Sequence, residues 1–368
     1  MKIALTHDHL FQIGGAEKVL LEMIQLFSKS PVYTLIDNMG ENFSKNVKIH
    51  TSSIQNLPFA KRHFKWYLPF MAMAWEKFDF SKYDVVISSA SAFAKGILVP
   101  PKTLHICYCH SPTRYLWSDT HQYIEELNQP LIIKKFLPLI LNYQRMWDFA
   151  AAQRVDKFIA NSHFVAKRIK KYYRRESDVI YPPVNVNRFK TSSEPENYFI
   201  IVSRLRPYKR VDIAIKAFNQ LGLPLLIVGS GEEEKRLKKI AKDNIKFLGE
   251  VNENKKIELL SKATAFIHPQ EEDFGIAAVE AMASGLPVIA YRRGGALETV
   301  IENETGSFFK EQTWESLADT IIRQDFGIFD RQKIKKTVEK FSNENFRSNL
   351  NNYITKSYQE YQGSILNF

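Results

Sequence analysis

The sequence of 368 residues is poor in cysteine and contains only Cys107 and Cys109. These two residues lie two positions apart in the apolar run LHICYC, and a strand would place both on one face. That spacing suits reduced thiols in a core better than a disulfide, so a scaffold built on disulfides is excluded. We therefore expect the protein to work in a reducing compartment, the cytoplasm.

Long apolar runs are also missing, because no stretch approaches the roughly 18 uncharged residues that a membrane-spanning helix needs. The opening residues MKIALTHDHLF reach charge and histidine too early for a signal peptide, and they predict a first buried strand. Internal repeats and low-complexity segments are absent as well. With 45% hydrophobic residues, the chain can form two domains with substantial cores.

Acidic residues are outnumbered, and the imbalance is concentrated in the first half of the chain. There are 51 Lys and Arg against 40 Asp and Glu, a formal net charge of +11. Residues 1–180 hold 24 of the basic and 15 of the acidic residues. No zinc-finger spacing or RNP1 sequence accompanies this charge, so we expect no nucleic-acid partner.

Two basic segments, residues 57–78 and 130–147, mix lysine and arginine with aromatic and aliphatic side chains. That mixture predicts contact with an anionic bilayer surface. The alternative is a lid or a core helix with basic edges. In the first segment, the residues expected to bind the membrane are Lys61, Arg62, Lys65 and Trp66.

Apolar runs alternate with helix-period segments along the whole chain, a pattern typical of parallel α/β sheets. A turn-rich segment at residues 181–197 predicts a linker, which gives a first domain over 1–184 and a second over 185–343. The first domain's expected strands are KIALTH, PVYTLI, DVVISS, LHICYC and KFIANS, with helices at about 15–28 and 163–173. The second domain's are FIIVS, LLIVG, IKFLG, AFIHP and PVIAY, with helices after Lys209 and at about 232–242, 253–262 and 274–284.

One strand–loop–helix unit, residues 265–291, carries two glutamates around the predicted start of a helix. That start would offer the backbone amides of Gly275 and Ile276 and the positive end of the helix dipole to a phosphate. Glu272 and Glu280 would lie about 12 Å apart at roughly 1.5 Å per residue, wider than the roughly 5–9.5 Å of a glycoside hydrolase pair. They would instead suit hydroxyl groups at the two ends of a long ligand such as a nucleotide sugar. The alternative is a solvated acidic loop before an ordinary core helix.

A second cluster, residues 198–212, places polar and basic side chains after a buried strand. The carboxyl ends of parallel strands are where open α/β sheets bind ligands, and cations there would neutralise a diphosphate. The alternative is an exposed basic loop, since charge runs are usually solvated. The side chains are Ser203, Arg204, Arg206, Lys209 and Arg210.

The Gly229-Ser-Gly231 sequence after LLIVG lacks the third glycine of a dinucleotide fingerprint, because Glu234 stands in its place. We expect Gly231 to turn the chain into the next helix while its loop lines a nucleotide pocket. No Asp-x-Asp occurs, and the His7-Asp8-His9 segment has no obvious third ligand, so we expect no catalytic metal.

With these clusters in view, the chain resembles the retaining glycosyltransferases of family 4. The family's E-x7-E signature is matched by Glu272, Phe274, Gly275 and Glu280, and its R-x4-K diphosphate-binding pair by Arg204 and Lys209. Further matches are the loop GGAE at residues 14–17, the segment CYCHSPTRYLW and the segment IANSHFVAKRI. The resemblance covers nearly the whole chain. It implies the α/β fold called GT-B, with two facing Rossmann-like domains, parallel sheets and a C-terminal helix, about residues 344–368, that crosses back to the first domain.

The resemblance also implies roles. Glu280 would hold the ribose hydroxyls, Glu272 would contact the donor sugar, and His110 would bond the transferred sugar. The departing diphosphate would be stabilised by Arg204, Lys209 and the helix amides, with no cofactor. The catalytic residues are thus expected to be His110, Glu272, Arg204 and Lys209, and the donor-binding residues Gly14, Gly15, Ser203, Gly229, Gly231, Phe274, Gly275, Ile276 and Glu280. The alternatives are a core histidine for His110 and plain tight turns for Gly14 and Gly15.

More narrowly, HSPTRYLW and YPPVN resemble bacterial mannosyltransferases that build O-antigen and other surface polysaccharides. This implies GDP-mannose as donor, a lipid-linked or other saccharide acceptor, retention of anomeric configuration, and a peripheral place on the inner face of the cytoplasmic membrane. A UDP-sugar donor, a GT-B-like sugar-nucleotide epimerase and a non-catalytic nucleotide-binding partner remain alternatives. The loops near 229–231 and 249–252 would select the base, and the sequence leaves base, sugar, acceptor, linkage and oligomeric state open.

Overall fold

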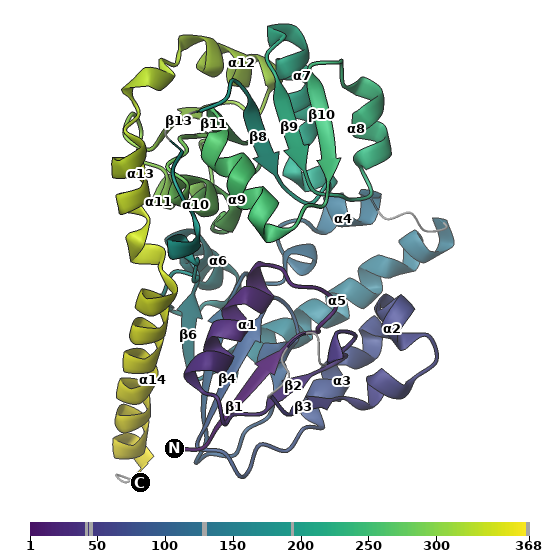
Figure 1. Ribbon diagram of the computed structural model, residues 1–368. Helices are drawn as coiled ribbons and strands as arrows, with labels where there is room; N and C mark the ends of the chain where they lie inside the picture. Colours follow the sequence, from purple (N-terminus) through teal and green to yellow (C-terminus); the bar gives the residue numbers. More distant parts are fainter. Residues whose placement is uncertain (41–42, 44–46, 127–130, 193–194, 366–368) are drawn as a thin grey trace. The chain divides into compact units, whose positions relative to one another are not determined.

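The computed structural model describes residues 1–40, 43, 47–126, 131–192 and 195–365. These residues form two compact units, each built on one parallel sheet (Figure 1). Unit 1 comprises Met1–Tyr181 and Phe346–Phe368, and unit 2 comprises Pro182–Asn345. Most of the long last helix, α14 (Asn343–Ile365), therefore belongs to unit 1.

The sheet of unit 1 has the strand order β3-β2-β1-β4-β5-β6-β7. Chain order reverses direction between β1 and β4, and such a switch point is where open α/β sheets bind ligands. The β1–β4 register pairs His7 with Ser89 at the carboxyl ends of the two strands. The strands are β1 (Ile3–His7), β2 (Val32–Thr34), β3 (Ile49–Thr51), β4 (Val85–Ala90), β5 (Leu104–Cys109), β6 (Lys157–Ala160) and β7 (Asp178–Val179).

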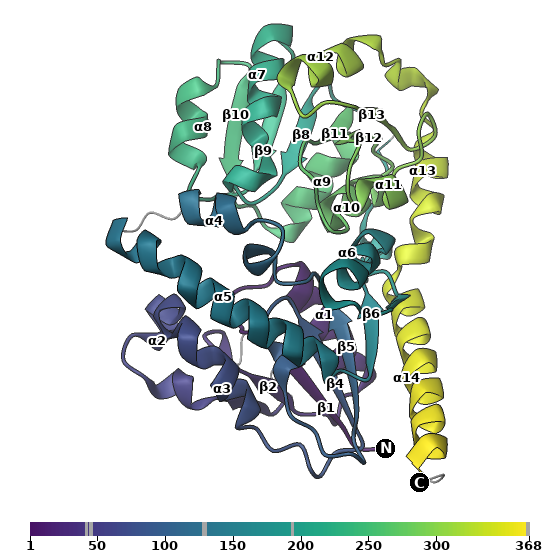
Figure 2. The same cartoon turned by 180° about the vertical axis from the view of Figure 1, so that it is seen from behind.

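Strand side chains alternate between two apolar layers in unit 1. On one face, strand residues pack with α3, α5 and α6, and on the other with α1 and α14; Figure 2 shows α5 on the side of the sheet away from α1. Cys107 and Cys109 are both buried, unbonded and part of the first layer, which confirms the predicted pair of reduced core thiols. Besides α14, the helices of unit 1 are α1 (Gly15–Leu26), α2 (Ala60–His63), α3 (Met71–Glu76), α4 (Thr120–Glu126), α5 (Leu131–Gln153) and α6 (His163–Tyr173), with the 3-10 segments η3 (Phe64–Phe70) and η4 (Ala94–Gly96).

The sheet of unit 2 has the order β10-β9-β8-β11-β12-β13, with its switch point between β8 and β11. One face is covered by apolar residues of α7 and α12 (Figure 1). The strands are β8 (Phe199–Val202), β9 (Leu225–Val228), β10 (Ile245–Gly249), β11 (Ala265–His268), β12 (Val288–Tyr291) and β13 (Gly306–Phe309). The helices are α7 (Val211–Leu221), α8 (Glu234–Ile240), α9 (Glu253–Lys262), α10 (Ile276–Ala283), α11 (Ala296–Thr299), α12 (Trp314–Arg323) and α13 (Arg331–Thr337).

Helix ends in unit 2 follow local chemistry. The Asn252 side chain accepts a hydrogen bond from the amide of Lys255, and α9 covers the predicted range 253–262. The helix predicted over 274–284 instead begins at Ile276, because Gly275 lies before it with a left-handed φ of +93°. Likewise, α8 is shorter than the predicted 232–242. Among the residues that the structure describes, no helix is both long enough and apolar enough to cross a membrane.

Candidate active site

Lys209 and Glu272 meet directly at the carboxyl edge of the unit 2 sheet. Lys209 ends the turn η7 (Pro207–Lys209) after β8, and Glu272 lies in the loop after β11, so the pair spans the switch point. Lys209 Nζ forms an ion pair with Glu272 Oε1, and the two side chains are only 16% and 15% exposed. Sequence reasoning placed these residues in two separate clusters, and the fold brings them together.

His268, the last residue of β11, is fully buried beside this pair. Burial, and then the positive charge of Lys209, lower the pKa of His268 to about 3. Its Nδ1 accepts from the Gln270 side-chain amide at 3.2 Å, which leaves the ring proton on Nε2, 3.9 Å from Glu272 Oε2. Glu272 therefore has a cation at one oxygen and a neutral N–H beside the other. The sequence treated His268 only as part of a strand; a histidine at a strand's carboxyl end was the available signal.

A pair of adjacent glycines holds the acidic loop in place. Gly294 has a φ of +65°, and a Cβ there would lie 2.3 Å from the Glu272 carbonyl oxygen. A Cβ on Gly295 would lie 2.4 Å from the Cα of Phe274, and the Gly295 amide donates to the Glu272 carbonyl at 2.8 Å. Sequence reasoning missed these glycines, although their position after the buried run PVIAY was a signal. Phe274 itself is buried and packs edge-on against Phe341, with ring centroids 5.2 Å apart.

Glu280 is buried on α10 and paired with a lysine that the sequence did not single out. Its Oε2 lies 3.0 Å from Nζ of Lys256 on α9. Burial lowers the pKa of Lys256, but the charges and hydrogen bonds of Glu280 and Glu253 together outweigh burial, and the net shift is upward. Glu253 is a second partner of Lys256 at 3.0 Å, on the more exposed side. The second glutamate of the signature is thus anchored from the neighbouring helix.

The other residues of the basic cluster divide into two groups. Arg206 pairs with Glu232 at 2.5 Å, and Arg210 pairs with Asp212 at 3.2 Å, both partly exposed. Arg204 is exposed at the same edge of the sheet, and the Ser203 hydroxyl donates to the Arg204 carbonyl at 3.1 Å. Arg204 and Lys209, which match the R-x4-K pair, are the candidate contacts for a diphosphate.

The two glycines after β9 allow a close approach of backbones. A Cβ on Gly229, whose φ is +122°, would lie 2.0 Å from the Ser203 carbonyl oxygen, and one on Gly231 would lie 2.3 Å from the Leu205 carbonyl oxygen. The Gly229 amide also donates to the Gly249 carbonyl at 2.7 Å, and the Ser230 hydroxyl donates to Glu250 at 2.5 Å. The loops at 229–231 and 249–252 thus meet at this edge.

In unit 1, His110 follows β5 at the carboxyl edge of the sheet. Its Nε2 lies 2.8 Å from the Ser89 hydroxyl, and its carbonyl accepts from Asn161 at 2.8 Å. Burial, followed by the charge of His7, lowers the pKa of His110 to about 4. The ring is therefore neutral near pH 7.

The glycine loop lies at the same edge of unit 1. Gly14 precedes α1 in an extended conformation (φ −117°, ψ −161°) that any residue can adopt, and Gly15 is the first residue of α1. The Gly14 amide donates to Glu17 Oε2 at 2.8 Å. Asp8, in the loop after β1, accepts from four successive backbone amides of residues 91–94 at 2.7–2.9 Å. Sequence reasoning did not foresee that role for Asp8.

The segment expected to meet lipid lies on the surface of unit 1. Lys61 and Arg62 lie on α2, and Lys65 and Trp66 on η3, all of them exposed. These four residues lie close together along the chain and are not part of the sheet edge that carries His110.

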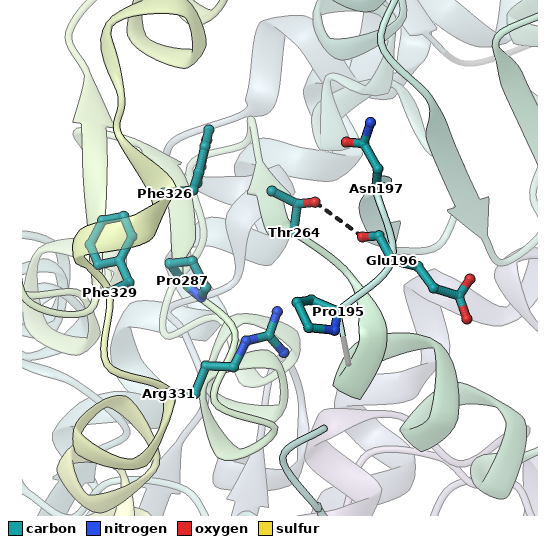
Figure 3. Close-up of a pocket in the computed structure, with 8 residues that line it drawn as sticks. All are labelled: Pro195, Glu196, Asn197, Thr264, Pro287, Phe326, Phe329 and Arg331. Atoms are coloured by element: carbon teal, nitrogen blue, oxygen red, sulfur yellow. Dashed lines mark hydrogen bonds between the residues drawn. The ribbon is translucent and has the colours of Figure 1, made fainter. Parts of the chain in front are cut away.

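A separate cavity of about 260 Å³ lies at the opposite edge of the unit 2 sheet, at the amino ends of β8, β11 and β12 (Figure 3). Arg331 there donates to the carbonyls of Ser261 and Ala263 at 2.6 Å each. The cavity lacks every residue of the site described above. Its lining residues are Pro195, Glu196, Asn197, Thr264, Pro287, Phe326, Phe329 and Arg331.

Two family models match the chain, "Glycosyltransferase Family 4" over residues 13–188 and "Glycosyl transferases group 1" over residues 184–324. The alpha-1,3/1,6-mannosyltransferase ALG2 of Dictyostelium discoideum is 26% identical over 340 residues, covering 76% of this chain and 77% of its own. The O-antigen chain mannosyltransferase RfbU of Salmonella typhimurium is 28% identical over 223 residues, 56% of this chain and 62% of its own. A GDP-mannose-dependent monoacylated alpha-(1-6)-phosphatidylinositol monomannoside mannosyltransferase of Corynebacterium glutamicum is 36% identical over 156 residues, 36% and 41% of the two chains.

Among solved structures, Anabaena HepE in complex with UDP superposes with a TM-score of 0.73 at 19% identity, covering 97% of this chain and 100% of that one. This likeness shows the GT-B fold, in which each of the two domains is Rossmann-like. The two family models together extend from residue 13 to residue 324. The chain therefore belongs to the glycosyltransferases that these two family models describe.

Proposed function

We propose that the protein transfers mannose from GDP-mannose to a lipid-linked or other saccharide acceptor during surface-polysaccharide synthesis, with retention and without a catalytic metal. Three named relatives from different organisms are mannosyltransferases, and one of them is described as GDP-mannose-dependent. Another is described as acting on the O-antigen chain. A UDP-sugar is the second candidate donor, because HepE was solved with UDP.

The observation that carries the proposal is the largely buried Lys209–Glu272 pair at the switch point of the unit 2 sheet. When a sugar diphosphate binds, we expect Lys209 to turn to the diphosphate and Glu272 to accept hydrogen bonds from sugar hydroxyls. Arg204 and the first amides of α10 would share the diphosphate charge. These interactions strengthen as charge develops on the leaving group, so they lower the barrier instead of only tightening binding.

The proposed chemical step needs no group beyond donor and acceptor. The acceptor hydroxyl oxygen forms a bond to the anomeric carbon on the face from which the diphosphate departs. The bond between that carbon and the phosphate oxygen breaks, and the departing phosphate oxygen takes the acceptor proton. The products are the retained glycoside and protonated GDP.

For the base, we propose that Glu250 favours guanine. Its carboxylate is exposed beside the 229–231 loop and is fixed on one oxygen by Ser230 at 2.5 Å. A carboxylate accepts well from the paired N–H donors on the Watson–Crick edge of guanine, and a site built for such donors rejects bases that lack them. Glu250→Gln should therefore narrow the difference in affinity between GDP and UDP, measured by calorimetry. An unchanged GDP preference would assign base selection elsewhere.

For the membrane, we propose that one face of unit 1 docks on an anionic bilayer. The segment 57–78 exposes Leu57, Phe59, Trp66, Phe70 and Met73, and Trp66 is 64% exposed. Helix α5 also exposes apolar side chains spaced three or four residues apart, which places them along one side of the helix. They are Phe136, Leu139, Tyr143 and Met146.

These two segments are neighbours. The Gln144 amide of α5 donates to the Leu68 carbonyl of η3 at 2.9 Å, and the Trp147 indole donates to Glu76 of α3 at 2.9 Å. An apolar groove of about 220 Å³, lined by residues that include Leu57 and Phe70, opens within the first segment and suits an acyl chain. The alternative, a core helix with basic edges, would account for only the side of α5 on which Leu141 is buried.

Charge complementarity favours lipid as the occupant of this face. The exposed cations around it are Lys61, Arg62, Lys65, Lys77 and Lys135. Aromatic side chains flanked by lysine and arginine suit the headgroup region of an anionic leaflet. In a flotation assay, vesicles with 30% phosphatidylglycerol should bind the protein, and Trp66→Ser with Leu139→Ser should reduce the bound fraction at least roughly tenfold.

The matched control is Ile322→Ser, which removes an equally exposed apolar side chain (70%) from unit 2. It should leave flotation unchanged. Equal binding by wild type and the Trp66/Leu139 variant would refute lipid docking, as would a concentration-dependent dimer that this variant abolishes.

The transfer itself is tested with radiolabelled GDP-mannose and bacterial lipid-linked saccharides. We expect label in the lipid fraction, lost in Glu272→Gln and retained in Glu271→Gln, the neighbouring carboxylate. Consumption of donor without acceptor would indicate the epimerase, and binding without turnover a non-catalytic partner. An inverted anomer in the product, read from its proton NMR spectrum, would refute retention.

A further inference from the structure

A chain of polar contacts in unit 1 joins His110 to the loop that precedes α1. His110 Nε2 lies 2.8 Å from the Ser89 hydroxyl, and the same hydroxyl lies 3.0 Å from His7 Nδ1. His7 Nε2 lies 3.6 Å from Glu17 Oε1, and Glu17 Oε2 accepts from the Gly14 amide at 2.8 Å. Of these residues, only His110 and Gly14 were assigned roles from the sequence.

The elements that place these groups are neighbours in the fold. His7 ends β1, Ser89 lies near the end of β4, and His110 follows β5, so all three lie at one edge of the sheet. Glu17 lies in the first turn of α1, where the positive end of the helix dipole favours a carboxylate. The side chains of His7 and Glu17 are only 4% and 15% exposed, so their interaction is weakly screened.

The direction of the hydrogen bonds follows from the charge at Glu17. At 3.6 Å the contact is long for a hydrogen bond, yet a carboxylate still repels a nitrogen lone pair and attracts an N–H. In its neutral form, His7 therefore carries its proton on Nε2 and presents a lone pair at Nδ1. The Ser89 hydroxyl has one proton, which it donates to His7 Nδ1. Ser89 must then accept from His110, which places the proton of His110 on Nε2.

We infer that Glu17, His7 and Ser89 are positioning residues that hold neutral His110 with its proton on Nε2 and its Nδ1 as a hydrogen-bond acceptor. Under the proposed function, on which this inference rests, Nδ1 accepts a hydroxyl proton of the transferred sugar. Glu17 also accepts a hydrogen bond from the Gly14 amide. A ligand that moves the glycine loop therefore shifts Glu17 and, through His7 and Ser89, changes the hydrogen bonding of His110.

The ring of His110 remains neutral within this arrangement. The ionisable groups that act on it are His7, Glu17 and Asp8, besides the effect of its own burial. Burial raises the pKa of Glu17, but the contacts with His7 and the Gly14 amide outweigh burial and lower it to about 2. Glu17 is therefore ionised throughout the neutral range, so the negative charge that orients the neutral ring of His7 is constant there.

Replacing Glu17 by glutamine should reverse the chain without changing its shape. The amide oxygen would keep the Gly14 contact, which turns the NH₂ group toward His7 Nε2. His7 would then accept at Nε2 and carry its proton on Nδ1, and Ser89 would donate to His110 Nε2. The proton of His110 would move to Nδ1, so the ring would present a donor where the wild type presents an acceptor.

The tautomer of His110 is measured by NMR on full-length protein labelled with ¹³C and ¹⁵N in histidine. His110→Asn identifies the signals by their loss. We expect the Nε2–H form in the wild type at pH 7.5, the Nδ1–H form in Glu17→Gln, and a mixture in Ser89→Ala, which breaks the chain. Glu22→Gln is the control, because Glu22 lies on the same helix but pairs with Arg347 at 2.7 Å; it should keep the wild-type form.

The same variants separate a positioning role from a structural one in kinetics. Glu17→Gln should lower kcat for mannosyl transfer roughly 10²-fold with little change in KM, because one contact to the reacting sugar changes from acceptor to donor. The inference is overturned if His110 has the same tautomer in wild type and Glu17→Gln, with both proteins shown to be folded by their amide spectra. The NMR result needs no donor, so loss of all transfer in every variant and the wild type would refute the proposed function and leave the tautomer result standing.

Discussion

Replacing Lys256 by methionine should strongly destabilise unit 2, because it removes the cation that pairs with the buried Glu280 carboxylate. The two charged side chains are only 9% and 7% exposed, and their atoms Nζ and Oε2 lie 3.0 Å apart. Methionine keeps an apolar stem at this position. Breaking one partner out of a buried pair costs about 3–5 kcal/mol. At about 2–4 °C per kcal/mol for a domain of this size, the unfolding midpoint should fall by about 6–20 °C.

The assay must report unit 2 separately from unit 1. Of the five tryptophans, only Trp314 falls between residues 182 and 345 of the sequence. ¹⁹F NMR of protein labelled with 5-fluorotryptophan therefore follows unit 2 through one signal during a thermal titration. The control is Lys255→Met on the same helix, whose exposed pair with Glu258 at 2.9 Å should contribute less than about 1 kcal/mol.

A second substitution shows whether the unpaired charge is the cause. Glu280→Gln in the Lys256→Met background should recover most of the lost stability. If Lys256→Met melts like Lys255→Met, the anchoring of Glu280 by α9 is refuted.

Three further variants test other parts of the site. Gly229→Ala should sharply lower the urea concentration at the unfolding midpoint, because the new Cβ would lie 2.0 Å from the Ser203 carbonyl oxygen. The control is Gly222→Ala, where the backbone is also left-handed but no atom lies within 4 Å of the new Cβ; it should cost only about 1–2 kcal/mol. The pKa of His268 is lowered to about 3, so below about pH 6.5 the unfolded chain binds a proton that the folded chain excludes. The free energy of unfolding should therefore fall as pH drops from about 6.5 toward 3. In urea titrations at a series of pH values, His268→Gln should flatten this pH dependence. Lys209→Met should lower kcat/KM for mannosyl transfer roughly 10²-fold or more while the far-UV circular dichroism spectrum is unchanged.

Much of the fold could be predicted because its strands are apolar runs bounded by turn residues. The bounds of α6 and α9 were predicted closely, since Ser162 and Asn252 are recognisable caps. The sequence did not predict β3, β7 and β13, which are short or weakly apolar. Strand β3 is only partly buried, β7 has two residues, and β13 consists of the sequence GSFF. Their pairing with long neighbours, not their own sequence, makes them strands.

The site was less predictable, because its contacts join residues distant in sequence. Nothing local marks Lys256 among the lysines of α9, and only the packing of α9 beside α10 selects it as the partner of Glu280. The sequence likewise gave no reason to single out Ser89 within its predicted strand. The β1–β4 register places it beside His7. By contrast, Glu272 was identified by its spacing from Glu280 in the E-x7-E signature, and the structure gives Glu272 the ion pair with Lys209.

The measurement that tests the central claim most directly is thermal stabilisation of the purified protein by GDP, UDP, ADP, dTDP and their sugar conjugates, without added metal. We predict selective stabilisation by GDP and GDP-mannose, about 2.7 kcal/mol at 100 times Kd. It should be lost in Arg204→Ala and kept in Arg206→Ala, whose side chain pairs with Glu232. Stabilisation by UDP-sugars alone would contradict the proposed donor, and no response to any nucleotide would contradict the assignment of this edge of unit 2 as a nucleotide-sugar site.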